Sequence, residues 1–188
     1  MSFADKLSIS RIILIPVFVS LLIYSRTYHF LKDAAVVVFL LAILSDFFDG
    51  LVARIKKEKS DIGQVIDPLA DKLLLLTAFI SLYLLRETLP LKFEMPLGFV
   101  LVVVSRDLII LLGVALLHFL KIEVIITPSW WGKLTTFFQM FTILGLLLNV
   151  FFFPWIWKIA LVFTLISGMD YFLRGAKSIN GKVHTSNP

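Results

Sequence analysis

The 188-residue chain contains no cysteine, and this absence removes two classes of chemistry. Without thiols the chain forms no disulfide bond and carries no thiolate nucleophile or thiolate metal ligand. Histidine is also scarce, because only His29, His118 and His184 occur, and their wide separation matches no metal-binding spacing. Thiolate chemistry and a histidine-based metal site are therefore not expected.

Charged residues are few, at 16% of the chain, whereas 59% of the residues are hydrophobic and the mean hydropathy is +0.95. These values exclude an ordinary soluble domain. Apolar runs near ~20 residues recur, which is the length that a helix needs to cross a hydrocarbon core of ~30 Å. The chain is too short to add a soluble domain, so residues 1–188 are predicted to form a single membrane domain.

The predicted fold is an all-α integral membrane protein with six transmembrane helices. The spans are placed at about 11–24, 34–53, 64–85, 97–120, 130–153 and 155–172. Residues 1–10 mix apolar and polar side chains and are predicted to form a short N-terminal interfacial segment.

The formal net charge of +5 comes mainly from lysines and arginines between the predicted spans. Basic residues so placed set topology and attract anionic lipid head groups, so membrane lipids are expected as partners and nucleic acid is not. With the N-terminus inside, Lys/Arg-rich segments such as 54–59 fall on the inner side and sparser ones such as 86–92 outside. The positive-inside rule therefore predicts a protein of the cytoplasmic (inner) membrane with both termini in the cytoplasm.

Four aspartates stand out against this apolar background, because they occur at helical spacing within one short stretch. If the second span is helical, positions 46, 49, 50, 53 and 54 follow i, i+3, i+4, i+7 and i+8 and share one face. Positions 63, 67 and 71 share one face of the next span in the same way. Two neighbouring helices would thus each present carboxylates on a single face.

The depth of these carboxylates predicts a metal site. If Arg54 and Gly63 mark the membrane surface, a rise of ~1.5 Å per residue puts Asp46 and Asp71 both ~12 Å inside. The other two aspartates then lie at similar, shallower depths. Four like charges in apolar surroundings would repel one another unless cations neutralised them, and hard divalent ions prefer all-oxygen sites of this kind.

The stretch is similar to the signature of the CDP-alcohol phosphatidyltransferases, Asp-x2-Asp-Gly-x2-Ala-Arg-x8-Gly-x3-Asp-x3-Asp. Every fixed position is filled, by Asp46, Asp49, Gly50, Ala53, Arg54, Gly63, Asp67 and Asp71. The resemblance covers residues 46–71, and the six-span hydropathy also fits this family. It implies an enzyme that joins an alcohol to CDP-diacylglycerol and releases CMP, and it implies a homodimer.

The resemblance also implies a role for each residue of the motif. The implied metal ligands are Asp46, Asp49, Asp67 and Asp71, which would hold Mg²⁺, with Mn²⁺ as the alternative ion. Asp71 is in addition the predicted catalytic base, although a bound cation lowers the pKa of a ligand and so opposes that role. The implied CDP-lipid-binding residues are Gly50, Ala53, Arg54, Ser60 and Gly63. Arg54 would neutralise the diphosphate, and the small residues would let the nucleotide approach the helices.

Three basic residues are candidates for binding the phosphate of the acceptor: Arg106, Lys133 and Arg174. Arg106 falls within an apolar span, where a cation is costly without a partner. Two interpretations stay open for it, acceptor binding or a structural pair with an aspartate such as the neighbouring Asp107. Lys133 and Arg174 lie at inner span ends, where phosphate binding competes with snorkelling or anchoring at the interface.

The sequence after Asp67 resembles two groups of the family, the phosphatidylglycerophosphate synthases and the CMP-forming cardiolipin synthases. Glycerol 3-phosphate is therefore the first predicted acceptor and phosphatidylglycerol the second, with inositol phosphate and serine behind them. The chain departs from the first group at Asp5 and Ser8, where Asn and Thr are usual, and at Asp107, where Glu is usual.

An alternative from a different class is a cation or proton transporter that uses buried carboxylates. The usual indication of such a transporter, matching interrupted segments in two repeated halves, is absent from the sequence. Nor does transport explain why Gly50, Ala53 and Arg54 share a face with the acids. The enzyme interpretation accounts for all of these positions.

Overall fold

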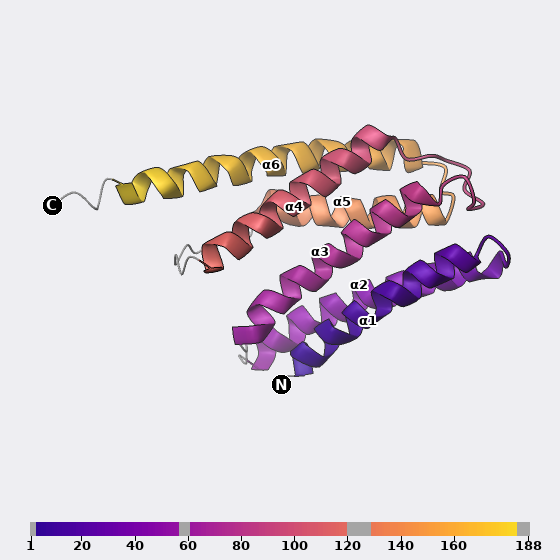
Figure 1. Ribbon diagram of the computed structural model, residues 1–188, viewed down its shortest axis with the longest axis horizontal. Coiled ribbons are helices and arrows are strands. Elements are labelled where there is room, and N and C mark those ends of the chain that lie inside the picture. The colour runs from indigo at the N-terminus through magenta and orange to yellow at the C-terminus, as the bar shows by residue number, and fades with distance from the viewer. Residues whose placement is uncertain (1–2, 57–60, 120–128, 184–188) are drawn as a thin grey trace. The chain divides into compact units, whose positions relative to one another are not determined.

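A computed structural model of the chain describes residues 3–56, 61–119 and 129–183, with side chains at 10–45, 69, 72–113 and 129–174. The described elements are all helices, as the apolar runs predict, and no strand occurs among them. They are α1 (Phe3–Tyr24), α2 (Phe30–Lys56), α3 (Asp61–Leu84), α4 (Leu97–Phe119), α5 (Trp130–Leu147) and α6 (Phe153–Val183) (Figure 1).

Three helix boundaries differ from the prediction by more than four residues. The N-terminal segment is not a separate element, because α1 is helical without a break from Phe3. At the other end, α6 continues to Val183, well past the predicted limit of 172. The predicted fifth span of 130–153 is too long, because α5 ends at Leu147 and α6 starts at Phe153, with Pro154 in its first turn. Proline is tolerated there because the first-turn N–H groups of a helix have no partner within the helix.

Asn149 explains why α5 stops early. Its φ of 54° is the only positive φ among the described non-glycine residues, and asparagine is one of the few residues that adopt this left-handed conformation readily. The backbone N–H of Val150 then donates to the carbonyl of Gly145 at 2.9 Å, which closes the end of the helix. The side chain of Asn149 also bonds the backbone of the loop before α4, at Pro90 and Lys92.

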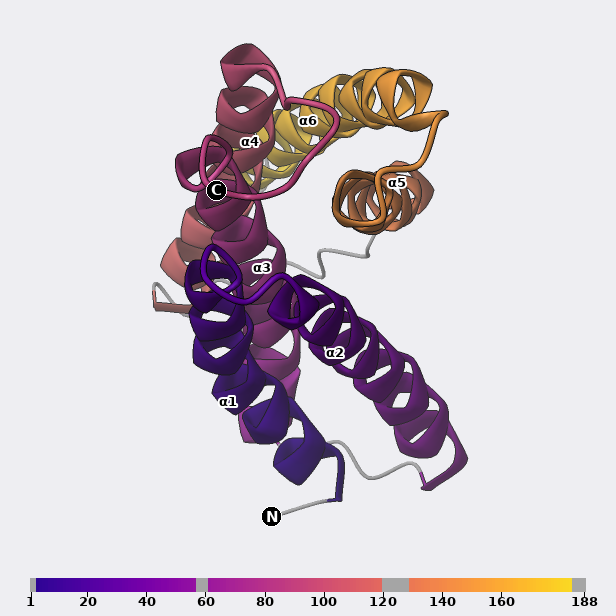
Figure 2. The ribbon, with the colours of Figure 1, turned by 90° about the vertical axis from the view of Figure 1, so that its right-hand side faces the viewer.

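The helices form two compact units, which are described separately. The first unit comprises Met1–Met95 together with Ile143–Phe151, and the second comprises Pro96–Thr142 together with Phe152–Pro188. In the first unit α1 packs against both α2 and α3. The chain runs in one direction along α1 and α3 and in the opposite direction along α2, so the start of α1, the end of α2 and the start of α3 lie at one end of this unit (Figures 1 and 2).

In the second unit α4 packs against α6, and side-chain contacts join α5 to α6. The hydroxyl of Thr135 on α5 donates to the carbonyl of Phe163 on α6 at 2.9 Å. The rings of Phe138 and Phe163 stack at 5.0 Å between the same two helices. Figure 2 shows α5 beside α6.

The second unit buries many polar side chains and exposes many apolar ones. Buried positions include Arg106, Asp107, Thr135, Gln139, Thr142, Thr164 and Ser167. Large apolar side chains are exposed along the same helices, among them Leu108, Ile109 and Leu112 on α4 and Leu165, Met169 and Phe172 on α6. Polar side chains inside and apolar side chains outside are the arrangement expected of helices in lipid.

A test of helix length and composition alone selects fewer membrane-spanning helices than the six predicted. Among the described residues, one helical segment, Phe153–Arg174, is long and apolar enough to cross a membrane, with a mean hydropathy of 1.5. Shorter apolar helical segments occur at Ser10–Tyr24 and Lys72–Leu84.

Candidate active site

The motif lies on two continuous helices. Positions 46, 49, 50, 53 and 54 belong to α2, and positions 63, 67 and 71 belong to α3. Since neither helix is interrupted, the spacing does place each set on one helical face, as the sequence predicted. The side chains at these positions, and all of Ser60, lie outside the described part of the structure, so the assigned roles stay predictions.

The motif faces continue the buried faces of their helices. On α2 the buried residues Ala35, Phe39 and Ala42 lead at helical spacing to position 46. On α3 the buried residues Leu75, Ala78 and Leu82 lie on one line with position 71, whereas Leu69 on another face is exposed. The motif positions of both helices thus lie on helical lines that are buried farther along each helix.

Arg11 on α1 is a cation that the packing of the first unit buries. Its side chain is 0% exposed and lies on one helical line with Phe18 and Leu22, which are also buried. Arg11 is eight residues from the start of α1, a rise of ~12 Å from the end of the unit where the motif-bearing parts of α2 and α3 also lie. A fully buried arginine was not predictable from composition, because exposure depends on what the helix packs against.

In the second unit Arg106 is the centre of a polar cluster built by α4, α5 and α6. Its side chain is 8% exposed and forms an ion pair with Asp107 and a hydrogen bond to the hydroxyl of Ser167. The ring of Tyr171 lies 5.8 Å from the guanidinium carbon. The structural pair with Asp107, one of the two interpretations open from the sequence, is thus present.

Ser129 connects the N-terminus of α5 to this cluster. Its hydroxyl oxygen accepts the backbone N–H of Gly132 at 3.0 Å, so Ser129 is the N-cap of α5. A Cβ placed on Gly132 would lie 3.7 Å from Arg106 Nη2, from Ser129 Oγ and from Ser167 Oγ. Gly132 therefore leaves a small space surrounded by polar atoms from all three helices. Sequence reasoning missed Ser129, Gly132 and Ser167, because only the packing of helices brings them together.

The other two predicted phosphate-binding residues are more exposed than Arg106. Lys133 is exposed, and its Nζ lies 5.2 Å from the centre of the Trp130 ring. Arg174 is 52% exposed and pairs with Asp170 one turn earlier, with Nε 2.9 Å from Oδ1. Each of the three predicted cations thus has its own partner.

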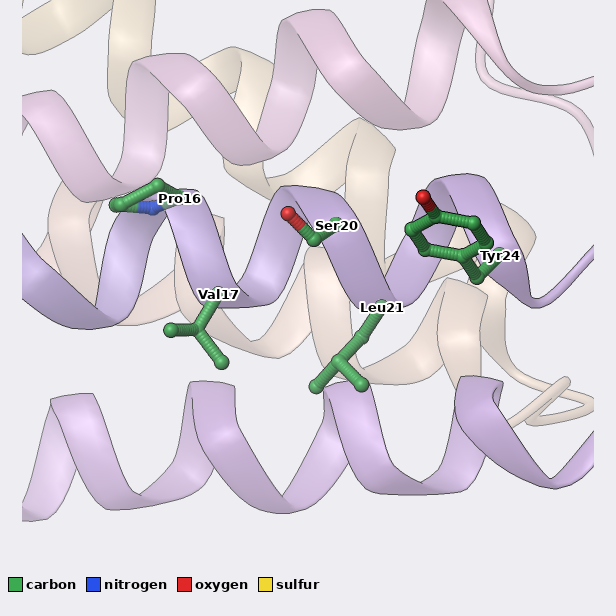
Figure 3. A pocket seen from close by; sticks show the side chains of 5 residues that line it. All are labelled: Pro16, Val17, Ser20, Leu21 and Tyr24. Atoms are coloured by element: carbon green, nitrogen blue, oxygen red, sulfur yellow. The ribbon is translucent and has the colours of Figure 1, made fainter.

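The groove that is visible on α1 does not contribute to this chemistry. It is lined by Pro16, Val17, Ser20, Leu21 and Tyr24 (Figure 3). All five residues come from one helix, none is charged, and Val17 and Leu21 point toward the neighbouring helix in the view shown. A largely apolar groove on one helix offers no cation that could neutralise a diphosphate.

Comparison with known proteins identifies the family. A family model described as CDP-alcohol phosphatidyltransferase matches residues 1–167. The chain is 31% identical to a probable phosphatidylglycerophosphate synthase of Mycobacterium tuberculosis, over 98% of this chain and 86% of the relative.

Two further relatives carry the name CDP-diacylglycerol–glycerol-3-phosphate 3-phosphatidyltransferase. The one from Aquifex aeolicus is 32% identical over 95% of this chain and 98% of its own length. The one from Bacillus subtilis is 28% identical over 93% of this chain and 95% of its own length. The family inferred from the motif is confirmed by these matches: the chain belongs to the CDP-alcohol phosphatidyltransferases, enzymes of the membrane that transfer phosphatidyl groups.

Proposed function

We propose that this enzyme transfers the phosphatidyl group of CDP-diacylglycerol to glycerol 3-phosphate, giving phosphatidylglycerol phosphate and CMP. The observation that carries the proposal is the complete motif at helical spacing on α2 and α3, in a chain whose relatives bear the name of this activity. Membership of the family indicates the class of reaction, and the names of the relatives indicate glycerol 3-phosphate as the acceptor.

In the proposed step, a hydroxyl oxygen of the acceptor attacks the phosphorus that carries diacylglycerol. The new P–O bond forms as the bond from that phosphorus to the bridging oxygen breaks, and this oxygen leaves with CMP. Asp71 takes the proton of the attacking hydroxyl. Transfer of this kind depends mainly on positioning and on neutralising charge, so Arg54 would stabilise the diphosphate.

The proposed metal ligands are Asp46, Asp49, Asp67 and Asp71. Four carboxylates at helical spacing on α2 and α3 suit Mg²⁺, or Mn²⁺ as the alternative, because both ions favour carboxylate and phosphate oxygens. A bound ion would neutralise the diphosphate and polarise the bond that breaks. Gly50, Ala53 and Gly63, together with Ser60, would leave room for the nucleotide and contact it.

For the acceptor we propose a phosphate site formed by Arg106, Lys133 and Arg174. Arg106 is buried in the polar cluster of the second unit, which suits a fixed contact, whereas Lys133 and Arg174 are exposed and contact Trp130 and Asp170, respectively. The three cations outnumber the two carboxylates with which they pair, those of Asp107 and Asp170, so the five residues together carry one positive charge, which favours an anion.

We further propose that all six helices span the inner membrane, with the motif facing the cytoplasm, and that the enzyme is a homodimer. The apolar surfaces of the helices and the basic segment after α2 support this arrangement. The homodimer rests on family resemblance alone and is tested by chemical cross-linking in membranes.

The test is an assay of CMP release by the purified protein with CDP-diacylglycerol and Mg²⁺, in which each acceptor is supplied in turn. Glycerol 3-phosphate is expected to give the highest kcat/KM. Phosphatidylglycerol is the second candidate. Arg106 is followed by Asp107 and not by glutamate, and in this the chain is closer to the CMP-forming cardiolipin synthases. A higher kcat/KM with phosphatidylglycerol would replace the proposed acceptor, and no CMP release with any acceptor would refute the transfer itself.

A further inference from the structure

The space above Gly132 has the size and the lining of a site for one oxygen atom. The hypothetical Cβ at this position meets its three nearest neighbours at 3.7 Å, an ordinary van der Waals distance, so a single methyl-sized atom fits. All three neighbours are polar: Arg106 Nη2, Ser129 Oγ and Ser167 Oγ. An atom that accepts hydrogen bonds is favoured there, because Arg106 Nη2 carries two N–H groups and donates to a single described partner, Ser167.

The guanidinium group of Arg106, which lies beside this space, still has N–H groups that can donate hydrogen bonds. Arg106 uses Nη1 to bind Asp107 and Nη2 to bind Ser167, while its buried Nε has no partner among the described residues. A guanidinium carries five N–H donors in a fixed plane. The N-terminus of α5, capped by Ser129, adds the positive end of a helix dipole at the same place.

We propose that this space receives one oxygen of the acceptor's phosphate, and that Ser167 holds the Arg106 guanidinium in the position to bind it. Gly132 is then a specificity-determining residue, because any side chain there would occupy the place of the oxygen. Ser167 is a positioning residue, since its hydroxyl acts on the substrate only through Arg106. This inference rests on the proposed use of glycerol 3-phosphate as acceptor.

The substitution Gly132→Ala tests the space directly. An added methyl group would make contacts of 3.7 Å without overlap and would favour the helix, so the protein should fold and its thermal unfolding temperature should not fall. The KM for glycerol 3-phosphate should rise by about tenfold or more, because a charge-assisted contact is lost, while the KM for CDP-diacylglycerol stays unchanged.

Gly168→Ala is the matched control. The added Cβ would lie 3.6 Å from Cγ of Arg106, so it touches the aliphatic stem of the same arginine and leaves its nitrogen atoms clear. Both KM values should match those of the unaltered enzyme. If Gly168→Ala raises the KM for glycerol 3-phosphate as much as Gly132→Ala does, general crowding of Arg106 explains the effect and the proposed oxygen site is wrong.

Ser167→Ala tests the positioning role, with Thr164→Val on the same helix as its control. Both hydroxyls are fully buried, but that of Thr164 donates to the carbonyl of Ala160 in its own helix at 2.7 Å. Ser167→Ala should raise the KM for glycerol 3-phosphate with little change in kcat, whereas Thr164→Val should leave this KM unchanged. Equal effects of the two variants would reduce Ser167 to a structural residue and overturn its assignment.

The same assays separate this inference from the proposed function. If the unaltered enzyme releases no CMP with glycerol 3-phosphate, the proposed function fails. If it does so and Gly132→Ala has a normal KM for glycerol 3-phosphate, only the oxygen site is refuted. A rise in the KM for CDP-diacylglycerol alone would assign the space to a phosphate of the lipid substrate and would also overturn the inference.

Discussion

Asn149 and Lys92 are joined by a hydrogen bond of 2.7 Å in which the side-chain Oδ1 of Asn149 accepts the backbone N–H of Lys92. The same side chain donates from Nδ2 to the carbonyl of Pro90 at 3.3 Å. One residue thus ends α5 and fixes the loop that leads to α4. Both functions depend on a left-handed backbone, since Asn149 has a φ of 54°.

Substitution of Asn149 should therefore destabilise the protein in two separable steps. Asn149→Gly keeps access to positive φ and loses only the side-chain bonds, at a cost of about 0.5–1.5 kcal/mol for each bond. Asn149→Ala also forces alanine into the left-handed region, which adds about 1 kcal/mol or more. In detergent, the thermal unfolding temperature should be highest for the unaltered protein, lower for Asn149→Gly and lowest for Asn149→Ala. An alanine variant as stable as the unaltered protein would contradict this account.

The four aspartates of the motif should each be indispensable for activity. Changing Asp46, Asp49, Asp67 or Asp71 singly to Asn removes a negatively charged ligand, and CMP release should be lost while the folded protein stays in the membrane. A chelator should also abolish CMP release, and added Mg²⁺ should restore it.

Asp33→Asn provides the control for this series. Asp33 is an exposed residue in the first turn of α2, the same helix that carries Asp46 and Asp49, and it lies outside the motif. Its replacement should leave CMP release unchanged. Near-full activity in two of the four motif variants would refute the metal site.

Arg106→Gln should affect stability as well as acceptor binding, because the residue is already paired. The substitution removes the cation that Asp107 binds in a buried environment, and breaking such a pair costs about 3–5 kcal/mol. The double variant Arg106→Gln, Asp107→Asn should recover part of this stability, since no charge then needs a partner. If the double variant also regains normal affinity for glycerol 3-phosphate, Arg106 has a structural role alone.

Lys133→Gln separates the binding role from stability. Lys133 is exposed and contacts the ring of Trp130, so its loss should change the unfolding temperature little. The KM for glycerol 3-phosphate should still rise by about tenfold if the ammonium group binds phosphate, because glutamine carries no charge. A normal KM in this variant would move the phosphate contact to Arg174.

The orientation of the protein in the membrane can be measured by cysteine labelling without first removing native thiols, because the chain contains no cysteine. Single cysteines replacing Lys57 and Arg86 should be labelled by membrane-impermeant reagents from the cytoplasmic and the outer side, respectively. The reverse pattern would place the motif on the outer side and refute the proposed topology.

The helical class, the approximate position of each helix and the family could all be predicted from the amino-acid sequence. Apolar runs of transmembrane length dictate helices because backbone groups cannot stay unpaired in lipid, and helical spacing alone places positions 46, 49 and 53 on one face. Both inferences need only local periodicity. The family follows from the motif, since eight fixed positions are filled at fixed spacing.

The tertiary structure alone decided the features that depend on contacts between distant segments. The end of α5 at Leu147 reflects bonds from Asn149 to a loop more than fifty residues away. The burial of Arg11 depends on the packing of α1 against α2 and α3. The space above Gly132 exists because α4, α5 and α6 bring Arg106, Ser129 and Ser167 to the same point. Sequence spacing describes one helix at a time, and only packing determines which side chains from different helices meet.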